Sequence, residues 1–449
     1  MINKIKEYKE IILNLIKLSL PILGGNLSHI LIGFADSIAA GRYSTLALGA
    51  ISVASAILMS ITVGAIGLLL SISPVVSNFR GEKTPSKKYF KLILLFSIVV
   101  SIPFFLILEL VLKNIGIFGF EAELEKLCAQ YIEICAWTIF PTALFVAMKE
   151  FLQAYEKVVY ANILAFVMVI LNVVLNFALT FGFESALLSI PPLGSSGIAI
   201  ATLISKTLVA IFLALYCFPL FKGAYHYSLN FIKELFKVGA PISAAIFFEF
   251  LGFNMTAVLI GKFSALYAAV HNIILCIANF TFMIVLSVSN ATSIKVGYFN
   301  GAKDVKSIEK YTIANFLIVL FVCIMTFTIL TKFSDLIIAM FSKDSEVIYW
   351  CNKILKIAIC FLFFDGLQGA CVGVLKGLKD TKTIMFTMLF GYLIVAIPLG
   401  SYLAFCKNIV LEGYWLALAL CLFLVSIITL FKVIRNIKKL RREYLETSA

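Results

Sequence analysis

The chain has 449 residues, of which 62% are hydrophobic and only 14% charged, and its formal net charge is +13. A water-soluble domain of this length would have to cover its surface with apolar residues, so the composition excludes one and indicates a membrane protein. The apolar residues form continuous runs rather than alternating with polar ones, which favours membrane-spanning helices of about 20 residues over a β-barrel.

The positive charge does not indicate nucleic-acid binding, because Lys and Arg lie in short segments between the apolar runs, where they orient a membrane protein. The ten cysteines are scattered without a CxxC pair, so we expect neither a disulfide framework nor a metal site of that kind. The first apolar run continues past residue 30, which favours a retained first helix over a cleaved signal.

Twelve apolar runs bounded by charged residues predict an all-α polytopic membrane protein with 12 transmembrane helices. With the N-terminus inside, 27 Lys and Arg fall in cytoplasmic segments and nine in external ones. This asymmetry follows the positive-inside rule and predicts that both termini are cytoplasmic. The predicted spans are 12–38, 45–78, 90–112, 127–148, 158–183, 194–220, 235–261, 264–294, 311–331, 354–375, 383–405 and 413–432.

An internal repeat relates the two halves of the chain. Residues Pro21–Gly81 align without a gap with Pro241–Gly301, and the loop GRYSTL at 41–46 falls on GKFSAL at 261–266. Chance could match a few apolar residues, but not this loop together with its flanking glycines. The sequence therefore predicts that each half is one copy of a common unit.

A weaker echo relates Phe151–Lys157 to Val374–Asp380. Both copies of the main repeat begin on the same side of the membrane, so the halves are expected to be parallel six-helix repeats about an axis along the membrane normal. We place their boundary in the linker after Lys222, which gives an N-terminal lobe of residues 1–225 and a C-terminal lobe of residues 226–449.

Ionisable residues within the spans are the first candidates for function. A charge at the centre of a membrane helix costs roughly 2.5–3.5 kcal/mol on insertion scales, so each needs a partner or a use. Glu249 lies near the middle of the seventh span, and His29 is its repeat counterpart, two helical turns before Asp36 and on the same face. For His271 a hydrogen-bonded packing role is the stronger expectation. The ionisable residues that we consider as candidates are His29, Asp36, Lys206, Glu249, His271 and Asp365.

Two polar pairs occur on the fifth and sixth spans. Asn172 and Asn176 are four residues apart, so both amides face the same neighbour, and Thr202 and Lys206 have the same spacing. Amides at this depth often hold helices together. For Lys206 two roles stay open, because it could neutralise Asp36 or extend toward the membrane surface.

A membrane-embedded transferase would need nucleophile, base and metal in or near a sizeable loop, and no loop here offers them. We therefore do not expect an enzyme. A channel is also conceivable, but two parallel repeats suit alternating access better. The sequence thus favours a transporter.

Several stretches together resemble one family. They are Pro21 with FADSIAAGRYSTLALGAISVA at 34–54, LNVVLNFALTFG at 171–182, LGSSGIAIAT at 193–202, the E-x-x-x-x-N spacing that begins at Glu249, and DGLQGACVGVLKGLKDT at 365–381. In this order they resemble the multidrug and toxic compound extrusion (MATE) transporters of the MOP superfamily, particularly the NorM-like bacterial branch.

The resemblance implies an antiporter of the bacterial cytoplasmic (inner) membrane in which Na⁺ or H⁺ drives export of organic, often cationic and aromatic, compounds. It implies a monomer whose partners are small organic molecules and the lipid bilayer, with no nucleic acid and no cofactor besides the coupling ion. The alternative function is a flippase of lipid-linked oligosaccharides or lipids from the same superfamily.

The resemblance also assigns candidate residues. It implies cation or proton coupling in each half, and either region is a candidate Na⁺ site. A tyrosine expected one turn before the tenth-helix acid is replaced by Phe361, which removes one oxygen ligand. The coupling candidates are Asp36, Asn172, Asn176 and Thr202 in the first half and Glu249 and Asp365 in the second, and the substrate-cavity candidates are His29, Lys206, Phe361 and Gln368.

Overall fold

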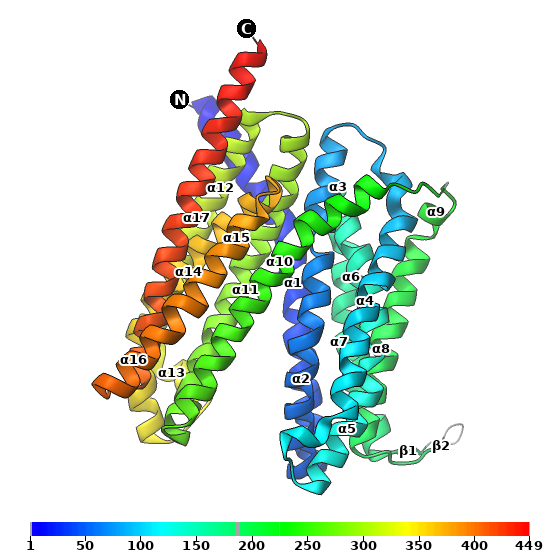
Figure 1. The fold of residues 1–449 in the computed structure, drawn as a ribbon, viewed down its shortest axis with the longest axis vertical. Coiled ribbons are helices and arrows are strands. Elements are labelled where there is room, and N and C mark those ends of the chain that lie inside the picture. The colour runs from blue at the N-terminus through cyan, green and yellow to red at the C-terminus, as the bar shows by residue number, and fades with distance from the viewer. Residues whose placement is uncertain (1, 185–188, 224, 449) are drawn as a thin grey trace. The chain divides into compact units, whose positions relative to one another are not determined.

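The computed structural model describes residues 2–184, 189–223 and 225–448, and most of them are helical (Figure 1). Within these ranges, eleven continuous helices are long and apolar enough to cross a bilayer. A twelfth span is the bent pair α5 (Ala122–Ala136) and α6 (Ile139–Ala154). The prediction of a polytopic all-α protein with twelve transmembrane helices is confirmed.

The bend in the fourth span has a local cause. The axes of α5 and α6 differ by 42°, and Pro141 stands three residues into α6. Proline has no amide hydrogen to donate to the carbonyl four residues earlier, so the helical hydrogen bond to Trp137 is missing at the bend. The chain tightens there instead, with the Thr138 amide bonded to the Cys135 carbonyl at 3.0 Å.

The chain forms two compact units. The N-unit comprises Gly24–Val76 and Pro85–Ser243, and the C-unit comprises Met1–Leu23, Ser77–Thr84 and Ala244–Ala449. Three helices run from one unit into the other, namely α1 (Ile2–Tyr43), α3 (Ile72–Gly81) and α10 (Leu229–Gly261). This division follows packing rather than the repeat, and the predicted lobe boundary at residue 225 stays a prediction.

The remaining elements fall within single units. Besides α5 and α6, those of the N-unit are α2 (Thr45–Leu69), η1 (Ser86–Tyr89), α4 (Phe90–Lys113), η2 (Ile115–Phe118), α7 (Val158–Phe181), β1 (Phe183–Glu184), β2 (Ser189–Ile190), α8 (Ser195–Tyr216) and α9 (Phe218–Phe221). Those of the C-unit are α11 (Ala265–Gly301), α12 (Val305–Lys332), α13 (Ser334–Ala339), α14 (Ser345–Gly377), α15 (Thr381–Met388), the π-helical η3 (Leu389–Ala396), α16 (Ile397–Lys407) and α17 (Leu411–Ser448).

The repeat is visible in the helix starts. Ser44 precedes α2 and its side chain accepts a hydrogen bond from the Ala47 amide, which caps the helix. Ser264, its repeat counterpart, caps α11 by accepting from the Leu266 amide. A serine at this position satisfies one of the amides that the first helical turn leaves without a partner. The matched loops GRYSTL and GKFSAL therefore each supply the serine that caps the following helix.

The helix ends repeat as well. Lys83 and Lys303 have φ of 58° and 57°, and Glu156 and Lys379 both have φ of 61°. In each case the residue's own amide bonds the carbonyl three residues back, and the next amide bonds the carbonyl five residues back. This is the left-handed cap that commonly ends helices, here built without glycine. The weaker repeat, Phe151–Lys157 and Val374–Asp380, therefore also has the same backbone conformation in both copies.

Both chain ends lie at the same end of the C-unit (Figure 1). Glu7 of α1 forms an ion pair with Lys310, near the start of α12, and Arg441 of α17 lies 3.9 Å from Glu309. Termini on one side require an even number of crossings, which agrees with twelve spans. The side of the membrane on which this end lies stays a prediction.

Small residues bring the helices of the N-unit close together. Ala39, Ala50, Ala54 and Ala199 are fully buried in a core formed by α1, α2, α5 and α8. Without large side chains between them, membrane helices can approach closely and gain packing energy. Asp36 lies one turn before Ala39, so the same core fixes the position of this acid.

Candidate functional site

Asp36 lies at the centre of a hydrogen-bonded cluster inside the N-unit. Its side chain is only 6% exposed. Asn176 of α7 donates from Nδ2 to Oδ1 at 2.7 Å, and Thr202 of α8 donates from Oγ1 to Oδ2 at 3.1 Å. Tyr131 of α5 adds a longer bond of 3.5 Å to Oδ2. One carboxylate thus joins four helices.

The second amide completes the cluster. Asn172 donates from Nδ2 to the hydroxyl of Thr202 at 3.1 Å, and its Oδ1 accepts from Asn176 at 3.2 Å. Both asparagines are fully buried. Their spacing of four residues places both amides on the face of α7 toward α1 and α8, as the sequence predicts. The structure therefore brings together Asp36, Asn172, Asn176 and Thr202.

Lys206 lies one turn beyond Thr202 on α8. It interacts electrostatically with Asp36 and Cys135. Among the described residues, however, no ion pair joins its ammonium group to Asp36. The hydrogen bonds from neutral donors, rather than a salt bridge, compensate the carboxylate in its low-dielectric surroundings.

The cluster offers oxygen atoms for a small cation. The Oδ1 atom of Asn176 and the hydroxyl of Thr180 are buried and have no hydrogen-bond partner among the described residues. As placed, the amide nitrogen of Asn176 faces Asp36, which suits a hydrogen-bonded carboxylate. Rotation of this amide by 180° would turn Oδ1 toward Asp36, and carboxylate, amide and hydroxyl oxygens are ligands that a hard cation accepts.

A second acidic group lies in the C-unit. Glu249 of α10 and Asp365 of α14 interact electrostatically, and Asp365 is 6% exposed. Glu249 also interacts with Lys376 and with the Tyr392 hydroxyl. In the described part of the chain, no hydrogen-bond donor contacts the Asp365 carboxylate. Two neighbouring carboxylates in a medium of low dielectric repel each other. Such a pair is stabilised when one of them takes up a proton or when both share a bound cation.

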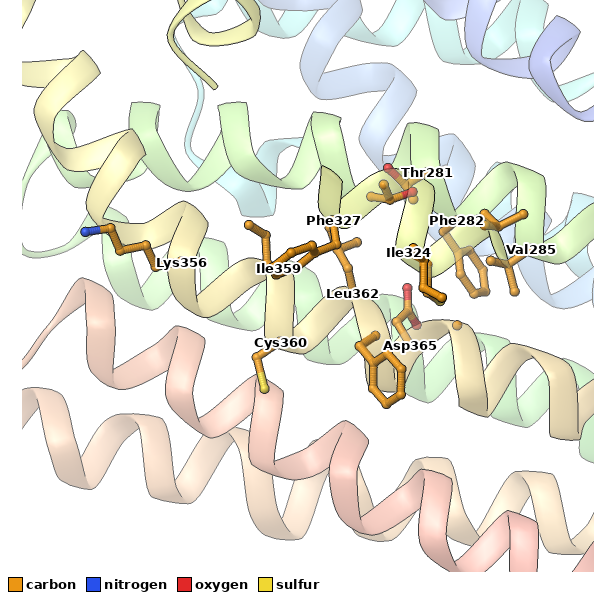
Figure 2. Close-up of a pocket in the computed structure, with 15 residues that line it drawn as sticks. Thr281, Phe282, Val285, Ile324, Phe327, Lys356, Ile359, Cys360, Leu362 and Asp365 are labelled. Atoms are coloured by element: carbon orange, nitrogen blue, oxygen red, sulfur yellow. The ribbon is translucent and has the colours of Figure 1, made fainter. Parts of the chain in front are cut away.

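Asp365 also lines a pocket between α11, α12 and α14 with a volume of about 440 Å³ (Figure 2). Its walls are mainly apolar, with Val285 from α11 and Ile324 from α12 beside the carboxylate and Lys356 at the opposite end. Ile324 is 56% exposed, so the pocket reaches the apolar surface of the C-unit. Its volume is within the range of pockets that hold drug-sized molecules.

Phe361 and Gln368 lie in the interior of the C-unit. Phe361 is 1% exposed and packs edge-on against Trp415, with ring centroids 5.4 Å apart. The amide nitrogen of Gln368 points at the sulfur of Met388, 3.9 Å away. Neither side chain lines the pocket beside Asp365. Their predicted place in a substrate cavity stays a prediction.

The structure describes the side chain of only one of the two candidate histidines. The side chain of His29 lies outside the described part. His271 is buried and packs against Trp415 at 5.6 Å between ring centroids, but both ring nitrogens lack a hydrogen-bond partner among the described residues. The ring contact fits the expected packing, but the expected hydrogen bond is absent among the described residues.

Two tyrosines that lie near the acids were not predicted from the sequence. Tyr131 belongs to a buried stripe with Cys128, Ile132 and Cys135 on α5, and this helical spacing was the available signal. Tyr392 lies in the π-helical segment η3. Such segments are rare and frequent at functional sites, but no sequence pattern marks them.

Twelve spans in two parallel repeats, with buried acids in each unit, define a secondary transporter rather than an enzyme. The MatE family model matches residues 21–178 and 241–402, so the chain belongs to the MatE family. The two matched segments begin at the repeat-related prolines Pro21 and Pro241. The predicted membership of this family is confirmed.

Curated relatives agree. The chain is 28% identical over 411 residues to a probable multidrug resistance protein NorM of Xylella fastidiosa, covering 89% of this chain and 87% of that protein. It is also 28% identical over 407 residues to the multidrug resistance protein NorM of Aliivibrio fischeri, covering 88% of each. The chain is thus a NorM-like multidrug efflux transporter by family.

Solved structures share the fold. A eukaryotic MATE transporter superposes with a TM-score of 0.84 at 20% identity, covering 97% of this chain and 99% of that one. A MOP-superfamily transporter from Pyrococcus furiosus gives a TM-score of 0.86 at 16% identity, covering 95% and 96%. At these identities the likeness is one of fold.

Proposed function

We propose that the protein is an antiporter of a bacterial cytoplasmic membrane, with both termini in the cytoplasm, that exports organic compounds in exchange for H⁺ or Na⁺. The observation that carries this proposal is the Asp36 cluster, a buried acid with three hydrogen-bond donors from three other helices. The Glu249–Asp365 pair supplies a second place for the coupling ion.

The Asp36 cluster supplies a means of coupling. A proton or Na⁺ that neutralises Asp36 removes the charge toward which Asn176, Thr202 and Tyr131 donate. The hydrogen bonds that join α5, α7 and α8 to α1 then rearrange, so ion binding and helix packing are linked. A substrate that prefers one of the two packings is driven by the ion gradient through this linkage.

The two ions make different demands on the cluster. A proton on Asp36 turns one carboxylate oxygen into a hydroxyl, and the Thr202 or Tyr131 hydroxyl can then accept from it, so hydrogen bonds reverse while the side chains keep their positions. Na⁺ needs several oxygen ligands, and the Asn176 amide would have to rotate to provide one. In the C-unit, Phe361 packs against Trp415 and offers no oxygen. We therefore propose H⁺ as the coupling ion at the Asp36 cluster, with Na⁺ as the alternative.

Organic cations with aromatic groups are the proposed substrates. The curated relatives carry the name multidrug resistance protein. Buried carboxylates attract cations, and an apolar pocket such as the one beside Asp365 favours the rest of such a molecule. The chain contains 41 Phe and 17 Tyr, and aromatic rings bind cations through their faces.

The test uses the purified protein in liposomes with ethidium as a fluorescent organic cation. We expect ethidium movement under an imposed pH gradient, and persistence of that movement when choline replaces Na⁺ at constant pH. Asp36→Asn should abolish it, whereas Glu121→Gln, at an exposed helix start without a capping bond, should not. Movement that follows only a Na⁺ gradient would replace H⁺ by Na⁺, and undiminished transport in Asp36→Asn would refute the coupling role.

The same liposomes separate the alternative function. If the wild-type protein moves lipid-linked oligosaccharide without an ion gradient and leaves ethidium unmoved, the protein is a flippase of the superfamily. The expected result is the opposite, because the two acidic sites have no purpose in an ion-independent flippase.

A further inference from the structure

Residues of α15, η3 and α17 line a groove. Figure 1 shows that α15 starts toward the end of the C-unit where the C-terminus lies. The groove has a volume of about 480 Å³. Its charged lining residues lie at one end, the polar end, which is formed by Asp380, Lys382, Thr383 and Lys432. Phe386, Phe390 and Ile428 form the apolar end, where Thr387 lies between the two phenylalanines in the chain.

The positive charges at the polar end are unpaired. Asp380, the acid of this groove, accepts hydrogen bonds from Asn436 of α17 at 2.7 Å and from Thr383 of α15 at 2.9 Å. Neither Lys382 nor Lys432 forms an ion pair with any described residue. Asp380 therefore ties the two helices together and leaves both ammonium groups available.

The remaining polar groups are used within the protein. The Thr383 hydroxyl donates to Asp380, and the Thr387 hydroxyl donates to the carbonyls of Thr383 and Ile384, both at 2.9 Å. The two lysines are therefore the available hydrogen-bond donors among the side chains that line the groove. Two such donors at one end suit an anionic group with several acceptor oxygens, such as a phosphate.

The apolar end continues away from the lysines along both helices. Lys382, Phe386 and Phe390 are spaced by four residues along the continuous helix of α15 and η3, so they form one stripe. On α17, Ile428 lies one turn before Lys432. Phe386 is 58% exposed and Phe390 is 40% exposed. Both rings belong to the stretch Thr381–Lys407, which is long and apolar enough to cross a membrane.

We propose that this groove is a binding site for an anionic phospholipid, with the phosphate held between Lys382 and Lys432 and an acyl chain along Phe386, Phe390 and Ile428. The order of charge and apolar surface along the groove matches the order of headgroup and chain in a lipid. Basic pockets between membrane helices bind anionic headgroups in this way. The proposal is independent of the transported compound and of the coupling ion.

The position of the groove gives the lipid a structural consequence. The Asp380–Asn436 bond is a polar side-chain contact between the start of α15 and the end of α17. Repulsion between Lys382 and Lys432 opposes the approach of the same two helix ends, and a phosphate between them removes it. Bound lipid should therefore raise the thermal stability of the protein.

The test is native mass spectrometry of the full-length protein in mild detergent with phosphatidylglycerol or phosphatidylcholine. We expect the wild-type protein to retain phosphatidylglycerol preferentially. The variant Lys382→Gln/Lys432→Gln should bind phosphatidylglycerol roughly 30-fold more weakly. This factor corresponds to the binding free energy of two lysines near an anionic lipid, about 1 kcal/mol each. The matched control Lys438→Gln/Arg442→Gln removes two charges from α17 outside the groove and should bind as the wild type does.

A second pair of variants tests the apolar end without altering charge. Ile428→Trp fills the groove and should weaken phosphatidylglycerol binding, whereas Ile427→Trp, on the neighbouring face of α17, should not. Melting temperatures of all variants without lipid establish that each is folded. The same spectra would also reveal a dimer that the lysine variant dissociates, if a second copy of the chain occupied the groove.

Four results would overturn the proposal. They are equal binding of both lipids, an unchanged affinity in Lys382→Gln/Lys432→Gln, an equal loss in the Lys438→Gln/Arg442→Gln control, and the dimer just described. An equal loss in the control would mean that general positive charge, rather than the groove, attracts the lipid.

Discussion

Asn176 donates a hydrogen bond of 2.7 Å to Asp36 although 140 residues separate them in the chain. The bond joins α7 to α1 inside the N-unit, and both side chains are buried. A hydrogen bond to a charged group in such surroundings contributes more than one at the surface, because water cannot replace the donor. The pair is therefore a structural contact and the centre of the proposed coupling site at once.

Asn176→Leu should test this dual role. The change preserves the size of the side chain but removes the donor, so we expect a stability loss of about 1–3 kcal/mol from the buried acceptor left behind. In the double variant Asp36→Leu/Asn176→Leu the loss should be smaller than the sum of the single losses. Thermal unfolding of all three variants in detergent measures this coupling, and additive losses would mean that the two residues do not interact.

Tyr131→Phe should have a smaller effect. Its hydroxyl lies 3.5 Å from the Asp36 carboxylate, at the limit of hydrogen bonding, and long bonds are weak. We expect less than about 1 kcal/mol of stability to be lost. Proton-driven ethidium transport should fall but persist. Complete loss of transport in a folded Tyr131→Phe protein would instead assign the tyrosine an essential part in ion transfer.

Asp365→Asn should separate stability from transport. Neutralising one carboxylate relieves the repulsion with Glu249, so the melting temperature should rise or stay equal. Ion-driven transport should fall at least about fivefold, the lower range for coupled sites. Glu346→Gln, an exposed acid at the start of α14, is the matched control. A destabilised Asp365→Asn protein with normal transport would make this acid structural.

Much of this architecture could be predicted from the sequence because it depends on composition and short-range pattern. Membrane helices follow from apolar runs, and the repeat follows from an ungapped alignment. The structure adds that the helix caps at Lys83 and Lys303, just beyond the aligned stretch, keep the same offset of about 220 residues. The helical spacing of Asn172 and Asn176 predicted that both amides share one face, whereas their grouping with Asp36 and Thr202 was implied by the family resemblance. The bend beside Pro141 could not be inferred from the missing amide hydrogen alone, because Pro21, Pro103 and Pro241 lie inside continuous helices.

Other features depend on contacts that no local pattern encodes. Tyr131 reaches Asp36 only because the alanine-rich core brings α5 against α1, and Tyr392 lies near Glu249 in a π-helical segment. The pocket beside Asp365 exists because three helices of the C-unit leave space at one depth. Lys206 illustrates the limit, since the sequence left open whether it neutralises Asp36 or extends toward the membrane surface, and its spacing from Thr202 could not decide between the two.

Gly81→Ala and Gly301→Ala should both be strongly destabilising. Within the C-unit, a Cβ atom at Gly81 would overlap the carbonyl oxygen of Tyr298, and one at Gly301 would overlap that of Asn78. Both neighbours are backbone atoms, so the helices would have to separate, at a cost of about 1–3 kcal/mol or more. Gly33→Ala, which meets no atom within 4 Å, is the control. Equal melting temperatures in the three variants would exclude a close contact at this crossing.

Lys303→Gly should stabilise the protein. Lys303 has a φ of 57°, a left-handed conformation that costs a residue with a side chain about 1–2 kcal/mol. Glycine avoids this penalty but loses more conformational freedom on folding, about 0.5–1 kcal/mol, so the net gain should lie between about 0 and 1.5 kcal/mol. Lys438→Gly is the control, because Lys438 lies inside the helix α17. There glycine adds conformational entropy to the unfolded chain but relieves no left-handed conformation, so the melting temperature should fall. If Lys303→Gly lowered it equally, the end of α11 would not adopt the left-handed cap in solution.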